Sequence, residues 1–256
     1  MKEPLTLIKV GGKIVEEENS LQRLLDRFTQ LPGHKVLVHG GGRTATDLAT
    51  RMGIETHMVN GRRITDDDML KIVTMVYAGL VNKNVVARLQ ALGTNAIGLT
   101  GADMNVIHSK RRPAGEVDYG HVGDPDRVDG ELLASLIGRG VVPVMAPLTH
   151  DGHGQLLNTN ADTIAGETAK ALAPYFDVTL TYCFEKKGVL RQADDDDSVI
   201  PEIRRDDFAR LTAEGIISGG MVPKIENALA AIEAGVTRVV ITHADAIDGN
   251  SGTVIR

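Results

Sequence analysis

The stretch KVLVHGGGRTATDLATRM, residues 35–52, indicates how this chain folds. Residues 36–38 are a short apolar run typical of a buried parallel strand, and three glycines follow at 40–42. Apolar residues then recur at helical spacing as far as Met52, so the order is strand, glycine turn, helix. Glycine lets the backbone approach a ligand, and a helix N-terminus favours negative charge, so the turn is suited to an anion. The glycines could instead serve only to pack a helix onto a sheet, because they match neither a Walker loop nor a Rossmann fingerprint.

The composition is that of an ordinary globular protein. The 256 residues suffice for one large α/β domain or two small lobes, and 42% of them are hydrophobic and 24% charged. The formal net charge of −6, from 28 basic and 34 acidic residues, argues against non-specific nucleic-acid binding. Cys183 is the single cysteine, which excludes an internal disulfide and fits a reducing compartment. No signal peptide or membrane span is apparent, so we expect a cytoplasmic protein with no membrane partner.

A second strand runs into glycines near the N-terminus. Residues 5–10 (LTLIKV) are strand-like and are followed by Gly11 and Gly12, with Lys9 near the carboxyl end of the strand. Lys9 could simply extend into solvent, as strand-end lysines do. Alternatively, it places a cation at the carboxyl edge of a parallel sheet, where α/β folds bind ligands.

Strands and helices alternate along the rest of the chain. We expect a helix capped by Ser20, a long helix capped by Thr65 with three aspartates at its positive end, and hairpins between residues 107 and 128. Strand 141–146 contains Pro143, which is unusual for a central strand. The alternation predicts an α/β fold, a three-layer αβα sandwich around a mostly parallel central sheet.

Two polar segments are not explained by packing. Residues 158–162 (NTNAD) precede a helix, and capping accounts for only one of their polar side chains. Lys224 follows the glycine-rich stretch 215–223 near a helix N-terminus, where a cation opposes the dipole and needs an anion to offset it. We find no Ser-His-Asp arrangement and no Cys/His metal spacing. Backbone donors and fixed cations are instead what phosphoryl transfer requires.

Taken together, these motifs resemble those of the amino-acid kinase family. They are KVGGK at 9–13, HGGG at 39–42, NGRRIT at 60–65, GHVG at 120–123, NTNAD at 158–162 and GIISGGMVPK at 215–224. The resemblance runs from the first strand to the last, and NGxRxT followed by NxNAD points to the acylglutamate branch. Aspartokinase, glutamate 5-kinase, carbamate kinase and UMP kinase are the alternatives within the family. A non-catalytic metabolite sensor is the alternative outside it.

The resemblance implies a catalytic role for three residues. The substrates would be small molecules: ATP would phosphorylate the side-chain carboxylate of N-acetyl-L-glutamate in arginine biosynthesis. Mg²⁺ would be held mainly by the nucleotide phosphates, with no metal site made by the protein. Lys9 and Lys224 would stabilise the transferring phosphoryl group from opposite sides, and Asp162 would hold both ammonium groups in place. No general base is required, because the nucleophile is already an anion.

The resemblance also implies two groups of binding residues. Arg63 would pair with a substrate carboxylate, and the acylglutamate would be bound by Gly41, Gly42 and Asn158. Phosphate and nucleotide contacts would come from Gly11, Gly12, Glu185, Gly188, Ile216, Gly219 and Met221. One departure from the family pattern concerns residues 183–187 (CFEKK), which occupy the stretch where the family usually has a Ser/Thr-Asp pair, so that Glu185 would replace the aspartate.

Domain organisation and assembly are further implications of the resemblance. Residues 1–172 would form an acylglutamate-binding and dimerisation lobe, and residues 173–256 a nucleotide-binding lobe. We expect a homodimer that arginine does not inhibit, because arginine-sensitive relatives carry an extra helix before the first strand and form hexamers. The acyl group is the least determined feature. N-succinyl-L-glutamate would need an extra cation for its second carboxylate, for which Arg62 and residues 110–112 are candidates.

Overall fold

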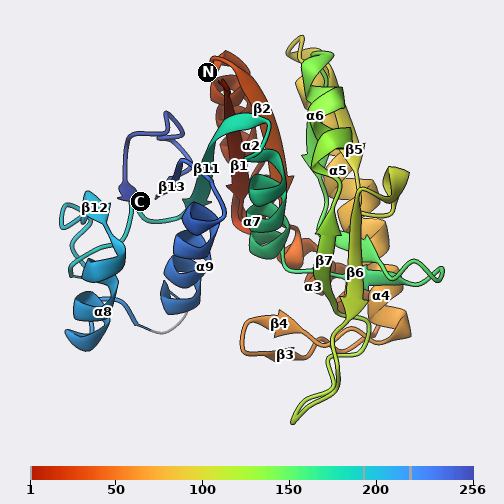
Figure 1. The fold of residues 1–256 in the computed structure, drawn as a ribbon. Coiled ribbons are helices and arrows are strands. Elements are labelled where there is room, and N and C mark those ends of the chain that lie inside the picture. The colour runs from red at the N-terminus through yellow and green to blue at the C-terminus, as the bar shows by residue number, and fades with distance from the viewer. Residues whose placement is uncertain (1, 193, 219–220) are drawn as a thin grey trace.

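A sheet of eight strands runs through the centre of the computed structural model (Figure 1), which describes residues 2–192, 194–218 and 221–256. From edge to edge, the strands are β12 (Glu202–Ile203), β14 (Thr253–Ile255), β13 (Arg238–His243), β11 (Phe176–Phe184), β1 (Glu3–Val10), β2 (His34–His39), β8 (Val142–Met145) and β5 (Ala96–Leu99). Every neighbouring pair is parallel except β13 and β14. The mostly parallel sheet predicted from the sequence is confirmed.

Helices cover both faces of this sheet. Successive side chains of β1 point to opposite faces, so Leu5 and Leu7 join one buried cluster while Ile8 and Val10 join another. The first cluster lies under α6 (Gly130–Gly138), α7 (Ala161–Leu172), α8 (Arg205–Ala213) and α9 (Met221–Glu233). The second lies under α1 (Gly12–Glu16), α2 (Glu18–Gln30), α3 (Gly42–Arg51), α4 (Asp67–Val73), η1 (Thr74–Val81) and α5 (Asn82–Ala91). The predicted three-layer αβα sandwich is therefore confirmed.

A smaller sheet and a short hairpin flank the carboxyl ends of the central strands. The hairpin predicted between residues 107 and 128 is confirmed, because β6 (Ile107–Arg111) and β7 (Gly123–Val128) pair antiparallel. They share a four-stranded sheet with β9 (Leu148–His150) and β10 (Leu156–Asn158), and a short 3₁₀ helix, η2 (Asp103–Asn105), precedes β6. The short hairpin beside this sheet is a separate unit, formed by β3 (Met58–Val59) and β4 (Arg62–Arg63). These two units bring Asn158 and Arg63 towards the glycine turns.

Two predicted helix caps are wrong. Asp66, not Thr65, caps α4 by accepting a hydrogen bond from the Met69 N–H (2.8 Å). Thr65 is buried, and its hydroxyl is used in a tertiary contact as the acceptor for the Asn158 amide (2.9 Å). Helix α2 begins at Glu18, and the Ser20 hydroxyl donates instead to the Glu17 carboxylate. Thr65 and Ser20 thus do not cap these helices, because their hydroxyl groups are hydrogen-bonded to other side chains.

The long helix predicted after Thr65 is present but not uniform. Its middle segment, η1, is a π-helix, and its half-exposed side chains include Met75 and Leu80.

No helix among the described residues is long and apolar enough to cross a membrane. Strand β8 lies inside the sheet despite Pro143. Pro143 pairs with β5 but precedes the part of β8 that pairs with β2, so the N–H that proline lacks is not needed on the β2 side.

Candidate active site

The two glycine turns after β1 and β2 lie against each other. The Gly40 N–H donates to the Val10 carbonyl (3.0 Å), which ties the turns together. A Cβ atom on Gly12 would lie 3.5 Å from the Gly42 nitrogen and 3.6 Å from the Gly41 nitrogen. Among the described residues, no acceptor is hydrogen-bonded to the N–H of Gly12 or Gly41. The turns therefore present converging N–H groups, as an anion site requires.

Lys9 and Asp162 form an ion pair at the carboxyl end of β1. The Lys9 ammonium lies 2.7 Å from an Asp162 carboxylate oxygen, and Lys9 is only 8% exposed. Asp162 lies in the first turn of α7, where the Asn160 side chain caps the helix and accepts from the Asp162 N–H (2.7 Å). The buried Tyr182 hydroxyl donates to the Asp162 carbonyl (3.3 Å). Lys9 therefore does not extend into solvent.

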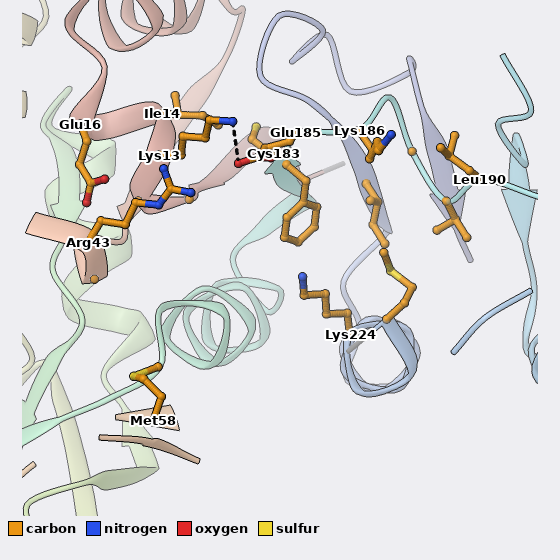
Figure 2. Close-up of a pocket in the computed structure, with 18 of the residues that line it drawn as sticks. Lys13, Ile14, Glu16, Arg43, Met58, Cys183, Glu185, Lys186, Leu190 and Lys224 are labelled. Atoms are coloured by element: carbon orange, nitrogen blue, oxygen red, sulfur yellow. Dashed lines mark ion pairs between the residues drawn. The ribbon is translucent and has the colours of Figure 1, made fainter. Parts of the chain in front are cut away.

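Lys224 reaches the same place from the first turn of α9. Figure 2 shows its side chain pointing from α9 into the pocket, and its ammonium lies 3.9 Å from the centre of the Phe184 ring. The Lys9 ammonium lies 5.6 Å from the centre of that ring. Burial lowers the pKa of Lys224, the Asp162 carboxylate opposes this shift, and the positive charge of Lys9 adds to it. The two lysines predicted from distant sequence segments thus converge on Phe184 and Asp162.

A small cavity of about 190 Å³ lies beside the second glycine turn. Its lining includes Gly41, Gly42, Arg63 and Asn158, so the structure brings together all four predicted acceptor-binding residues. Arg63 is 7% exposed, and its guanidinium donates to the Gly42 carbonyl (2.8 Å) and to the Thr46 hydroxyl (2.9 Å). The polar groups of this cavity are therefore fixed by the protein before any ligand arrives.

A larger cavity of about 1120 Å³ opens along the carboxyl ends of β1, β11 and β13. Its lining includes most of the predicted nucleotide residues: Gly11, Gly12, Glu185, Gly188, Ile216 and Met221. Gly219 lies outside the described residues. Val189, Leu190 and Ile241 give the cavity an apolar section that suits a flat base. Gly42 and Arg63 line both cavities, so the two spaces adjoin at the second glycine turn.

Sequence reasoning missed three cations of the larger cavity: Lys186, Lys13 and Arg43. Lys13 and Arg43 each directly follow a glycine turn and lie in the first turn of a helix, where a cation is unfavourable without an anion. The same signal, which predicts a role for Lys224, applies to both of them. Lys13 pairs with Glu185 (3.2 Å) across the cavity mouth, as the dashed line in Figure 2 shows. Arg43 has no ion-pair partner within the described part of the chain.

The site combines converging N–H groups, two converging ammonium groups and a carboxylate that orients one of them. Residues 4–243 also match the model of the amino acid kinase family over nearly the whole chain. This chain belongs to that family. Its amino acid kinase relatives include the acetylglutamate kinase of Bacteroides thetaiotaomicron, 69% identical over 256 residues and covering all of both chains. The acetylglutamate kinase of Methanopyrus kandleri is 42% identical over 98% of this chain and all of the relative.

Solved structures show the same amino acid kinase fold. The smu.665 protein of Streptococcus mutans superposes with a TM-score of 0.78 at 28% identity, covering 98% of both chains. The N-acetylglutamate synthase of Neisseria gonorrhoeae, solved with coenzyme A and N-acetyl-glutamate, has a TM-score of 0.82 at 23% identity. It is matched over 98% of this chain and 59% of that protein. At this identity the second likeness supports the fold alone.

Proposed function

We propose that this chain transfers the γ-phosphoryl group of ATP to the side-chain carboxylate of N-acetyl-L-glutamate, as a step of arginine biosynthesis. The observation that carries the proposal is the convergence of Lys9, Asp162 and Lys224 beside two adjoining cavities of unequal size. Relatives that are 65–69% identical over 98–100% of this chain carry the name acetylglutamate kinase, which supports the choice of acceptor.

The protein's role in this reaction is charge stabilisation and alignment. A carboxylate oxygen of the acceptor forms the new bond to phosphorus, and the electron pair of the broken bond stays on the departing ADP. No proton moves, so no side chain needs to act as a base. Lys9 and Lys224 would balance the charge on the transferring group, while the Gly12 and Gly41 N–H groups donate to its oxygens. Asp162 keeps the Lys9 ammonium in place.

The two cavities divide the substrates between them. The smaller one would take the acylglutamate, with its carboxylate near Arg63 and its backbone atoms near Asn158. The larger one would take ATP, the donor of the phosphoryl group, together with Mg²⁺. The cavity cations Lys13 and Arg43 would face the phosphates in this arrangement. No group of three or more His, Cys, Asp or Glu side chains among the described residues is placed to hold a metal. We therefore propose that the nucleotide phosphates provide most of the Mg²⁺ ligands.

The deciding experiment traps the acyl phosphate product. Hydroxylamine converts the acyl phosphate of an amino-acid acceptor into a hydroxamate, and it converts carbamoyl phosphate into hydroxyurea. With ATP and Mg²⁺ we expect hydroxamate from N-acetylglutamate, little or none from aspartate or glutamate, and no hydroxyurea from carbamate. Hydroxamate from another acceptor alone would assign a different activity of the family. A protein that binds N-acetylglutamate without forming hydroxamate would be a sensor.

N-succinyl-L-glutamate is a second candidate acceptor because Arg62 lines the smaller cavity. The other candidate cations are already paired with carboxylates: Lys110 with Asp126 (3.5 Å), Arg111 with Asp118 (3.8 Å) and Arg112 with Asp124 (2.5 Å). This leaves Arg62 as the better partner for a distal carboxylate. Comparison of kcat/KM for the two acceptors under identical ATP and Mg²⁺ decides between them. A clear succinyl preference that is lost in Arg62→Ala would replace acetyl by succinyl in the proposed reaction.

The predicted lobes and dimer belong to the same proposal. Every residue lining the smaller cavity lies within 40–161, inside the predicted lobe 1–172. The larger cavity is lined by both lobes: 11 of its residues lie between Gly11 and Arg63, and 11 lie between Cys183 and Ile241. The half-exposed Met75 and Leu80 on η1 favour a subunit contact there, and we propose a cytoplasmic homodimer. Light scattering should give twice the chain mass, and millimolar arginine should not inhibit; a hexamer or arginine inhibition would contradict this.

A further inference from the structure

His39 is a completely buried histidine that the proposed reaction does not use. It is the last residue of β2, directly before the second glycine turn. Burial lowers its pKa to about 4, so the ring is neutral at physiological pH. A buried polar ring is costly unless both nitrogens find partners. In this structure both do.

The partners of His39 fix which nitrogen carries the proton. Nδ1 lies 2.7 Å from the Gly40 carbonyl oxygen, which can only accept, so Nδ1 donates. Nε2 lies 3.0 Å from the amide nitrogen of Asn82, which can only donate, so Nε2 accepts. The same Asn82 nitrogen donates to the Val144 carbonyl (2.9 Å), and the Asn82 oxygen accepts from Lys83 (3.1 Å). The network permits a single orientation of the Asn82 amide.

The hydrogen bond to Gly40 determines where the next N–H points. The Gly40 carbonyl and the Gly41 N–H belong to one peptide unit, and no peptide bond in the described residues is cis. In a trans peptide the carbonyl and the N–H point in opposite directions. When His39 holds the carbonyl on its own side, the Gly41 N–H is directed away from His39. This N–H lies close to Gly12 and, like the Gly12 N–H, has no acceptor among the described residues.

The π-helical segment η1 supplies the side chains that pack against Gly41 in the second glycine turn. A Cβ atom on Gly41 would lie 3.0 Å from the Tyr77 ring and 3.3 Å from Val81, so these side chains pack closely against Gly41. Asn82 follows directly at the start of α5. On the other side, Arg63 binds the Gly42 carbonyl. The turn is thus fixed by two hydrogen bonds, from His39 to the Gly40 carbonyl and from Arg63 to the Gly42 carbonyl.

We propose that His39 is a positioning residue: together with Asn82 it fixes the Gly40–Gly41 peptide so that the Gly41 N–H faces the transferring phosphoryl group. The inference rests on the proposed kinase function, because it assigns that N–H a phosphoryl oxygen. His39 acts through the peptide and does not touch the substrates. Its loss should therefore lower kcat more than it changes the KM for ATP.

Two substitutions separate the two hydrogen bonds of His39. His39→Asn keeps an N–H donor at the δ position, whereas His39→Gln keeps an acceptor at the ε position for Asn82. Each loses one bond of a buried side chain, so similar losses of thermal stability are expected. We expect kcat within about threefold of the wild type for His39→Asn, and about tenfold or more below it for His39→Gln, the size of effect typical of groups that orient a functional ligand. The KM for ATP should change less than kcat in both.

A matched control removes packing from the same layer without touching the turn. Leu89→Ala on α5 creates a hole in the second buried cluster and should lower the melting temperature while leaving kcat per folded molecule unchanged. Equal kcat values in His39→Asn and His39→Gln would overturn the positioning role. A loss of kcat in Leu89→Ala as large as that in His39→Gln, at a similar drop in melting temperature, would also overturn it, because lower stability alone would then explain the effect.

A measurement without substrates separates this inference from the proposed function. Nitrogen-15 NMR of the His39 ring at pH 7 should show a protonated Nδ1 and an unprotonated Nε2. A proton on Nε2, or a doubly protonated ring, would overturn the positioning role even in an active kinase. If instead the wild type forms no hydroxamate with any acceptor, the proposed function fails while the NMR result stands on its own.

Discussion

The two cavities at the glycine turns are built differently. In the smaller one, Arg63 and Asn158 are 7% and 8% exposed, and each is hydrogen-bonded to the protein. At the mouth of the larger one, the side chains of Lys13 and Glu185 are 42% and 59% exposed and are joined by an ion pair of 3.2 Å. One cavity is fixed from within, and the other is bordered by side chains that can rearrange.

This difference indicates where selectivity lies. A buried polar group that loses its ligand partner is costly, so a fixed cavity rejects acceptors that leave its groups unpaired. Solvent-exposed ion pairs contribute little and are easily exchanged, so the larger cavity can adapt to a flexible triphosphate. The acceptor should therefore be recognised strictly and the nucleotide more loosely.

The largest effect is expected at the two ammonium groups beside the larger cavity. Lys9→Ala or Lys224→Ala should leave a folded protein and lower kcat by about a hundredfold or more, because each removes a preorganised charge from the transferring group. Circular dichroism and steady-state rates measure both quantities. Lys170→Ala is the control, since Lys170 lies on the same helix as Asp162 and, among the residues that the structure describes, pairs with Glu167 alone. Near-normal turnover, or unfolding at ambient temperature, would remove the assignment.

A smaller but selective effect is expected at the fixed cavity. Arg63→Lys keeps the charge but loses the planar fork that holds the Gly42 carbonyl and Thr46. We expect kcat/KM for the acceptor to fall by about tenfold or more, while the KM for ATP changes little, as for the loss of a buried charge-assisted bond. Arg88→Lys, away from both cavities and paired with Glu18, is the control. Equal losses for acceptor and nucleotide would erase the contrast between the cavities.

A still smaller effect is expected at the adaptable cavity. Lys13→Ala or Arg43→Ala should raise the KM for ATP by about two- to fivefold with little change in acceptor KM, because exposed charges contribute roughly 1 kcal/mol or less. Arg51→Ala, at the far end of helix α3 from Arg43, is the matched control. The comparison requires steady-state kinetics at fixed ionic strength. An acceptor KM that rises more than the ATP KM would contradict this prediction.

The smallest expected effect is a difference between the pH profiles of kcat and kcat/KM at alkaline pH. Burial holds the pKa of Lys224 below its ordinary value of 10.5. In the proposed reaction the ammonium form of Lys224 is the active one. The kcat/KM for ATP should therefore be constant near neutral pH and fall as the pH rises through this lowered pKa. Bound phosphate stabilises the ammonium, so the alkaline limb of kcat should lie at higher pH than that of kcat/KM. Coincident limbs would show that the nucleotide does not contact Lys224.

Local sequence patterns predicted the parts of the site that depend on strand and helix ends. Lys9, Asp162 and Lys224 each lie at such an end, so the topology of a parallel sheet brings them together. The bonds between distant segments were not predictable in this way. Asn82 meets His39 across 43 residues, and Thr65 leaves its expected cap position to bind Asn158. The π-helix was also missed, since apolar spacing does not distinguish it from an α-helix.

The close packing of Tyr77 on Gly41 has a spectroscopic consequence. The chain has no tryptophan and four tyrosines. Tyr77 lines the smaller cavity, and Tyr182 contacts Asp162. Two of the four tyrosines thus lie at the candidate active site, with no brighter indole to mask their emission. Filling of the smaller cavity can be followed as a change in tyrosine emission of the unlabelled protein, and Tyr77→Phe identifies the part of that signal that comes from the glycine turn.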